Sequence, residues 1–167
     1  MNKIIILRGN SASGKSTTAI GLQKKLERGN SLLIQQDNVR REMLWEKWES
    51  KHVETIKLIK SLVEYGNKNY KYTILEGILY PGTYDELFKM IMQLYGENIH
   101  AYYFDVPFEE TVKRQKQRPI HNKFGETEMK EWWREKDFIK FIPEKIIDAV
   151  KMSNAEVVEM IFEDVVD

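Results

Sequence analysis

Lys3-Ile4-Ile5-Ile6-Leu7-Arg8-Gly9-Asn10-Ser11-Ala12-Ser13-Gly14-Lys15-Ser16 is the stretch of sequence that decides the fold. Its apolar start predicts a buried strand over Lys3–Leu7. Apolar residues at helical spacing predict a helix from Lys15 to about Arg28. Residues 9–16 match G-x-x-x-x-G-K-[ST], the pattern of a phosphate-binding loop, between that strand and that helix. The order strand, loop, helix is the context in which this motif binds a nucleotide.

Each fixed position of the motif has a physical role. The two glycines permit a tight turn, so that successive N–H groups point at phosphate oxygens, and the following helix adds the positive end of its dipole. Lys15 is expected to reach the β- and γ-phosphates, and the Ser16 hydroxyl to ligate Mg²⁺. The residues predicted to bind ATP are Gly9, Asn10, Ser11, Ala12, Ser13, Gly14, Lys15, Ser16 and Thr17.

The rest of the chain alternates apolar strands with helical stretches, which predicts an α/β fold with a parallel sheet covered on both faces. The ligand site should lie beyond the carboxyl ends of the strands. Two capping boxes, Thr83 with Glu86 and Ser153 with Glu156, mark helix starts. Further strands are predicted at 31–36, 72–75, 100–106 and 145–148, and further helices at 38–69, from 83, at 107–118, at 126–138 and from 153.

Composition bounds the function classes. With 167 residues and 42% hydrophobic residues, the chain is expected to form a single domain over 1–167. It has no cysteine, which excludes disulfides, cysteine-ligated metals and thiol catalysis. The 26 basic and 26 acidic residues cancel, so no bulk field is available for duplex nucleic acid or a membrane surface. The apolar runs are too short for a membrane span or a signal peptide, so a cytoplasmic location is expected.

Two signatures of regulatory GTPases are missing. No glycine follows an aspartate at the Asp-x-x-Gly spacing, and Asn122-Lys123 is followed by Phe124-Gly125 and not by an aspartate at the fourth position. A small phosphotransferase is the simplest remaining user of the phosphate-binding loop.

The chain resembles P-loop kinases of the small-molecule and polynucleotide kinase group, which includes chloramphenicol phosphotransferase, zeta-toxin-type sugar kinases and uridine kinases. Four stretches carry the resemblance: the loop at 9–16, Asp37-Asn38-Val39-Arg40, Ile74-Leu75-Glu76-Gly77-Ile78-Leu79, and Arg114-x-x-x-Arg118. The resemblance implies a three-layer α/β/α P-loop NTPase fold with a five-stranded sheet in the order 2-3-1-4-5 and a small lid at about 114–134. It also implies ATP and Mg²⁺, with transfer of the γ-phosphoryl group to a hydroxyl.

The same resemblance assigns the roles of the site residues. Asp37 is the expected base that activates the acceptor, although its place in the sequence also suits a helix N-cap. Arg40 is favoured as the acceptor contact; one of Arg40 and Arg41 is expected on a solvated helix face, and the sequence leaves open which of the two contacts the acceptor. Glu76 is expected near Mg²⁺ or the acceptor hydroxyl. The remaining expected residues are Lys15, Arg114 and Arg118 as catalytic cations on the transferring phosphate, Tyr80 in the acceptor pocket, and Arg134 as a weaker candidate.

Aromatic and histidine side chains receive structural interpretations. Aromatic residues at helical spacing belong more often to a core than to a ligand site, so a packing role is expected for the tryptophans. The histidines show no metal-ligand spacing. The residues concerned are Trp45, Trp48, Trp132, Trp133, His52, His100 and His121.

Three functions stay open at this stage. A small-molecule acceptor such as a nucleoside, a sugar or an antibiotic is favoured. A polynucleotide 5′-hydroxyl acceptor needs a basic track, for which the sequence near Asp37 offers only Arg40 and Arg41. The third possibility is a nucleotide-dependent binding module with little transfer activity. Neither the choice of ATP over GTP nor the oligomeric state follows from the sequence.

Overall fold

A five-stranded parallel sheet in the order β2-β3-β1-β4-β5 forms the centre of the fold. The structure is a computed structural model that describes residues 2–47, 49–119 and 124–166; the predictions for Trp48 and His121 fall outside these residues. The strands are β1 (Lys3–Gly9), β2 (Ser31–Gln35), β3 (Tyr72–Gly77), β4 (Ile99–Asp105) and β5 (Glu144–Asp148). The predicted fold class and strand order are confirmed.

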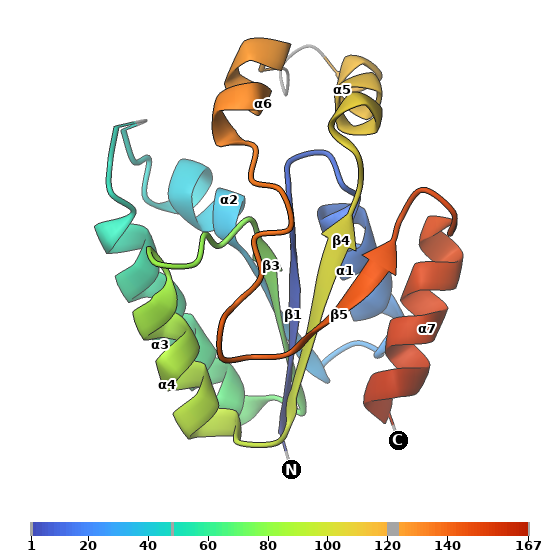
Figure 1. Ribbon diagram of the computed structural model, residues 1–167. Coiled ribbons are helices and arrows are strands. Elements are labelled where there is room, and N and C mark those ends of the chain that lie inside the picture. Colours follow the sequence, from blue (N-terminus) through green and yellow to red (C-terminus); the bar gives the residue numbers. More distant parts are fainter. Residues whose placement is uncertain (1, 48, 120–123, 167) are drawn as a thin grey trace.

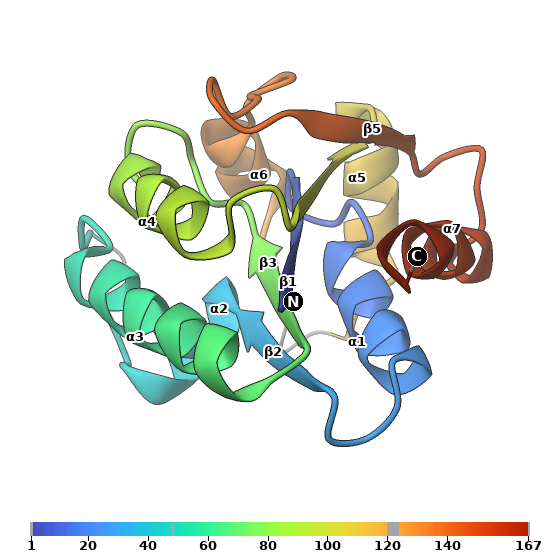
Figure 2. The ribbon, with the colours of Figure 1, turned by 90° about the horizontal axis from the view of Figure 1, so that it is seen from below.

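Helices cover both faces of the sheet (Figures 1 and 2). On one face lie α1 (Lys15–Lys25) and α7 (Asn154–Val166), and on the other α3 (Val53–Asn69) and α4 (Asp85–Tyr95). Side chains of the central strand β1 belong to the core on both faces of the sheet. Ile5 and Leu7 pack in the core beside α1 and α7, and Ile4 and Ile6 pack in the core beside α3 and α4. A strand buried on both faces is apolar at consecutive positions, which explains the run that opened the sequence analysis.

The remaining helices lie near the carboxyl edge of the sheet. The short α2 (Gln36–Asn38) continues into a π-helical turn, η1 (Val39–Met43), directly after β2. Beyond the strand ends, α5 (Phe108–Lys116) and α6 (Glu126–Trp132) form the uppermost part of the molecule in Figure 1. The region expected as a lid, at about 114–134, contains the last residues of α5 and all of α6, and its role as a lid stays a prediction.

The predicted helix over 38–69 is wrong, because the chain leaves the helix after Met43 and α3 begins only at Val53. Hydrogen bonds hold the intervening loop: the Glu46 carboxylate accepts the Ser50 hydroxyl at 2.6 Å and the Thr55 N–H at 3.0 Å. The predicted helix over 126–138 is also too long. It ends at Trp132, because the backbone of Trp133 is extended. The first helix ends at Lys25, three residues before its predicted end at Arg28.

One predicted capping box is confirmed and one is wrong. The Ser153 N–H donates to the Glu156 carboxylate at 2.7 Å, and the Glu156 N–H donates to the Ser153 hydroxyl at 3.3 Å. The expected pair of Thr83 and Glu86 does not form, since α4 begins at Asp85. There the Asp85 carboxylate accepts the N–H of Gly82 at 2.8 Å instead.

None of the helices in the described ranges has the length and apolar character needed to cross a membrane.

A buried ion pair fastens the carboxyl half of the chain to the central strand. Arg8 and Glu144 have side chains that are each 1% exposed, and Arg8 Nη1 lies 2.8 Å from Glu144 Oε1. Arg8 also donates to the carbonyl of Asp137 at 2.9 Å and to that of Leu79 at 3.2 Å. A buried charge is tolerated when it is paired and hydrogen-bonded in this way.

We predict that Arg8→Ala lowers the free energy of unfolding by about 3–5 kcal/mol, because the substitution leaves the Glu144 carboxylate buried without its cation. Urea denaturation followed by circular dichroism measures this loss. Lys57→Ala is the matched control, since the Lys57–Glu54 pair is exposed and should contribute little. Equal losses for the two variants would contradict the special role of burial.

Candidate nucleotide and acceptor site

The phosphate-binding loop follows β1 and precedes α1, as the motif predicts. Two of its glycines have left-handed backbone angles, with φ 144° at Gly9 and φ 101° at Gly14. A Cβ on Gly9 would lie 2.7 Å from the carbonyl oxygen of Phe104, so the loop passes too close to β4 for any side chain there. These two positions require glycine because the chain must reverse tightly.

Lys15 lies inside the curve of this loop. Its side chain is buried, and its ammonium donates to the Asn10 carbonyl at 2.7 Å and to the Ser13 hydroxyl at 3.3 Å. Burial lowers the pKa of Lys15, against the attraction of the Glu76 and Asp37 carboxylates, which raises it. The loop therefore holds its cation where a chain of phosphates would supply the counter-charge.

Glu76 lies near the end of β3 and faces the start of α1. The Glu76 side chain is buried; its Oε1 accepts the Ser16 hydroxyl at 3.0 Å and its Oε2 accepts the Gln35 amide at 3.3 Å. Burial raises the pKa of Glu76, and the Lys15 ammonium opposes that shift. A buried carboxylate with a raised pKa is typical of a functional site.

The Ser16 and Glu76 oxygens fit Mg²⁺. Two adjacent ligands of an octahedral Mg²⁺ lie ~2.9 Å apart when each metal–oxygen distance is ~2.05 Å, and the two oxygens are 3.0 Å apart. Among the described residues, no three His, Asp or Glu side chains gather in a group that could hold a metal. One hydroxyl and one carboxylate are thus available, which suits an ion that keeps its waters and takes phosphate oxygens.

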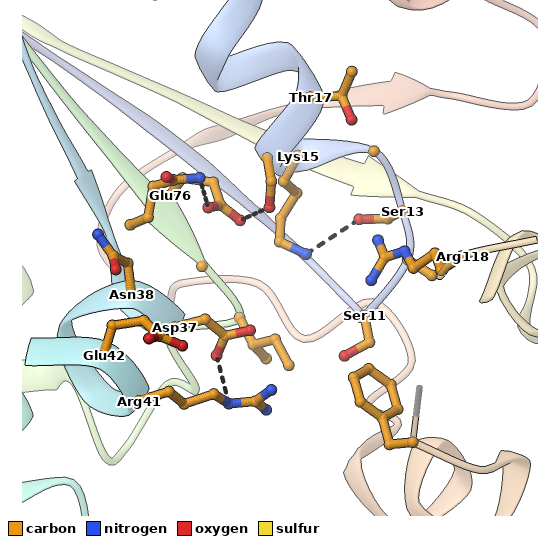
Figure 3. Close-up of a pocket in the computed structure, with 17 residues that line it drawn as sticks. Ser11, Ser13, Lys15, Thr17, Asp37, Asn38, Arg41, Glu42, Glu76 and Arg118 are labelled. Atoms are coloured by element: carbon orange, nitrogen blue, oxygen red, sulfur yellow. Dashed lines mark hydrogen bonds and ion pairs between the residues drawn. The ribbon is translucent and has the colours of Figure 1, made fainter. Parts of the chain in front are cut away.

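A single cavity of about 880 Å³ joins this loop to the helical turn after β2. Figure 3 shows Lys15 and Glu76 at one end, Asp37, Asn38, Arg41 and Glu42 at the other, and Arg118 beside the loop. The residues that line the cavity are Ser11, Ala12, Ser13, Gly14, Lys15, Ser16, Thr17, Gln35, Asp37, Asn38, Arg41, Glu42, Glu76, Gly77, Ile78, Arg118 and Phe124.

Gln36, which the sequence analysis missed, fixes the turn that carries Asp37. Its side chain is buried; Oε1 accepts the Leu79 N–H at 3.1 Å and Nε2 donates to the Tyr84 hydroxyl at 2.7 Å. A Cβ on Gly77 would lie 2.3 Å from Gln36 Oε1, so the close approach requires this glycine. The Tyr84 hydroxyl lies 2.7 Å from His52 Nδ1, which gives His52 the structural role expected of it.

The structure brings Arg41, and not Arg40, to the cavity. Arg41 Nε lies 3.8 Å from Asp37 Oδ1, and its guanidinium lies 6.0 Å from the centre of the Phe124 ring. Arg40 faces the following loop, where its Nε lies 3.5 Å from Glu46 Oε2. The role of Arg40 as an acceptor contact stays a prediction that this geometry does not favour.

Arg118 lines the cavity, whereas Arg114 supports the loop from behind. The Arg114 guanidinium donates to the carbonyls of Ser13 at 3.3 Å and Ala149 at 2.7 Å, and to the Glu110 carboxylate at 3.0 Å. Arg118 lies beyond the end of α5 at Lys116, two residues short of the predicted helix end, and there it lines the cavity. The two predicted lid arginines therefore occupy different places.

Tyr80 and Arg134 lie outside the described lining of the cavity. The Tyr80 hydroxyl donates to the Trp132 carbonyl at 3.0 Å, and the Arg134 guanidinium lies 5.4 Å from the centre of the Tyr80 ring. The Asn10 side-chain amide donates to the Arg134 carbonyl at 2.7 Å and accepts the Arg134 N–H at 3.0 Å. Asn10 thus ties the loop to the chain after α6, which the motif does not predict.

The tryptophans differ in their surroundings. Trp132 packs edge-on against Phe124, and Trp133 packs edge-on against Phe108, with ring centres 4.9 and 5.2 Å apart. Trp45 does not belong to the core, contrary to expectation: it is 83% exposed and has a left-handed φ of 50°. The prediction assumed that Trp45 lies on a helix, but the helical turn ends at Met43, before this residue.

The sheet order, the phosphate-binding loop and the cavity beside it define a nucleotide-binding domain with the fold of the P-loop kinases. The chain belongs to the AAA domain family, whose model matches residues 4–140. No protein with curated annotation matches the chain.

Two solved structures of kinases share the fold over almost the whole chain, and a part of an RNA repair complex shares it over a smaller portion. A gluconokinase from Sinorhizobium meliloti 1021 is 14% identical with a TM-score of 0.70, over 98% of this chain and 91% of that one. The Mycobacterium tuberculosis APS kinase CysC, in complex with AMPPNP and APS, is 17% identical with a TM-score of 0.68, over 99% and 98%. A Pnkp1/Rnl/Hen1 RNA repair complex is 22% identical with a TM-score of 0.58, over 78% and 42%. At these identities the likeness shows the fold.

We predict that Glu76→Gln raises the stability of the ligand-free protein at neutral pH, because burial penalises the charged form of this carboxyl. A folded-state pKa above the unfolded value gives stability that is fully present below the unfolded pKa and is lost as pH rises through the folded pKa. The gain should therefore grow with rising pH from about 4 upward. Urea denaturation of both proteins across this range measures the gain. Glu64→Gln, on an exposed position of α3, is the control, and an identical pH profile for wild type and Glu76→Gln would contradict the assignment.

Proposed function

We propose that the protein is a kinase that moves the γ-phosphoryl group of ATP, with Mg²⁺, to a hydroxyl of a small molecule. The observation that carries this proposal is the continuous cavity between Lys15 and Asp37. A module that only binds nucleotide needs no such connection to a carboxylate. The kinases that share the fold support the proposal, and a cytoplasmic location and a preference for ATP over GTP remain predictions within it.

Each side chain of the cavity has a task in this reaction. Lys15 and the loop N–H groups bind the β- and γ-phosphates, and Ser16 with Glu76 would hold Mg²⁺, which neutralises phosphate charge when bound. Asp37 accepts a hydrogen bond from the acceptor hydroxyl and takes its proton as the new O–P bond forms. The bond from the γ-phosphorus to the bridging oxygen breaks, and ADP leaves with the electron pair. Arg118 stabilises charge on the transferring group.

A polynucleotide acceptor is the second candidate, supported by the likeness to the RNA repair complex. Binding of a nucleic acid strand needs a positively charged groove that follows its backbone. Among the described residues at the acceptor end of the cavity, Arg41 is the only cation, and the carboxylates of Asp37 and Glu42 lie beside it. This balance favours a small-molecule acceptor.

We predict that Asp37→Asn lowers kcat by about 10²–10⁴, the usual contribution of a general base, while the KM for ATP changes little. The assay is transfer of labelled γ-phosphate to a panel of nucleosides, sugars, antibiotics and 5′-hydroxyl oligonucleotides. Asp85→Asn, at the start of α4 and outside the cavity lining, is the matched control. Full turnover by Asp37→Asn would remove the proposed base.

We also predict that Arg41→Ala raises the acceptor KM by about tenfold, because a charge-assisted contact of the guanidinium is lost. Arg40→Ala should change the acceptor KM far less, since Arg40 pairs with Glu46 and does not line the cavity that contains Asp37 and Lys15. Steady-state kinetics with each variant separates the two arginines. A larger effect at Arg40 would restore the assignment made from the sequence.

A further inference from the structure

The acceptor end of the cavity carries more negative than positive charge. Asp37, Glu42 and Arg41 all line it, and Figure 3 shows the three side chains near one another beside Asn38. Arg41 is engaged by Asp37 at 3.8 Å. Lys15 and Arg118 stand at the phosphate end, where ATP would occupy them. Among the residues that the structure describes, what remains for the acceptor is two carboxylates with one arginine that is paired with Asp37.

A second, smaller cavity adjoins this end. It has a volume of about 330 Å³ and is lined by Arg40, Arg41, Glu42, Trp45 and Glu46. Because Arg41 and Glu42 line both cavities, the two meet at these residues. An indole that is 83% exposed forms part of the outer one. An exposed aromatic face next to a ligand cavity offers a stacking surface for a ring.

Resting on the function proposed above, we propose that the acceptor is a hydroxyl compound without negative charge, neutral or amine-bearing, whose far end carries a ring that stacks on Trp45. Its hydroxyl lies at Asp37 and its body passes Arg41 and Glu42. Neutral hydroxyls and ammonium groups can donate hydrogen bonds to the Glu42 carboxylate.

The charges at this end of the cavity disfavour an anionic acceptor. Sites for phosphate, sulfate or carboxylate groups use arginine in a bidentate contact or several cations together. Arg41 is the one described cation at this end, its charge is already partly balanced by Asp37, and an approaching anion would also face the carboxylates of Asp37 and Glu42. The same charges disfavour a polynucleotide, whose phosphates are held by several cations.

The test compares acceptors that differ only in charge or only in their ring. We expect glucosides and glucosaminides to be phosphorylated with a kcat/KM at least about tenfold above that of the matching glucuronides, and adenosine or uridine above the corresponding monophosphates. Each sugar is offered as the methyl and as the phenyl glycoside. A glucuronide or a nucleoside monophosphate as the best acceptor would overturn the inference and leave the kinase proposal standing. Binding of ATP with no transfer to any compound would instead overturn the kinase proposal, and the inference with it.

Two variants separate the charge from the ring. Glu42→Gln should reduce the preference for amine-bearing over anionic acceptors by about tenfold without changing the KM for ATP. The control Glu64→Gln should leave that preference unchanged.

Trp45→Ala should raise the KM for phenyl glycosides by between about 5- and 150-fold and leave the KM for methyl glycosides unchanged. The control is Tyr65→Ala, because Tyr65 is also an exposed aromatic residue but lies on α3, outside both cavities. An equal change in KM for phenyl and methyl glycosides would show that Trp45 acts only on local structure. That result would contradict the proposed contact between Trp45 and the ring of the acceptor.

Discussion

The phosphate-binding loop is folded around one buried ammonium group, that of Lys15. Lys15 is held by the Asn10 carbonyl and the Ser13 hydroxyl, and burial disfavours its charge. Only a backbone that turns back on itself can place those oxygens around Lys15, and that turn needs left-handed glycines at 9 and 14. Burial also disfavours the negative charge of Glu76 nearby. The site therefore keeps two opposite charges away from water, each in a place where a magnesium nucleotide would meet it.

Local sequence predicts local structure here, and its errors come from long-range contacts. The strand, loop and helix around 3–25 could be predicted because each residue's neighbours along the chain also determine its surroundings. By contrast, β3 extends through Glu76 and Gly77, two residues past its predicted end, since Glu76 is satisfied by Ser16 and Gln35 from distant segments. The break between 43 and 53 likewise depends on Glu46 closing its loop. Hydrophobic periodicity contains no trace of these hydrogen bonds. The strand order came from the resemblance to a family, not from periodicity.

The candidate site shows the same division. The motif predicted Lys15 and Ser16, and the resemblance predicted Asp37 and Glu76. Asp37 comes just after β2 and Glu76 lies at the end of β3, so both lie at the carboxyl edge of the sheet. Arginines were harder to place. The i,i+4 spacing of Arg114 and Arg118 predicts one shared helix face, but α5 ends at Lys116, and Arg114 alone of the two donates to the Ser13 and Ala149 carbonyls. The sequence does not decide between Arg40 and Arg41, because both side chains are long and flexible. In the structure, Arg40 pairs with Glu46 and Arg41 pairs with Asp37.

The chain that follows α6 is fastened to the phosphate-binding loop and to its strand at two points. Asn10 binds the backbone of Arg134 through two hydrogen bonds, and Arg8 donates to the carbonyl of Asp137. Both anchors sit in the stretch that also carries the loop glycines, so β1 positions the nucleotide and this segment together. On the other side of α6, Phe124 contacts Arg41 near the acceptor end of the cavity. The carboxyl end of α6 is thus fixed to the nucleotide half of the site.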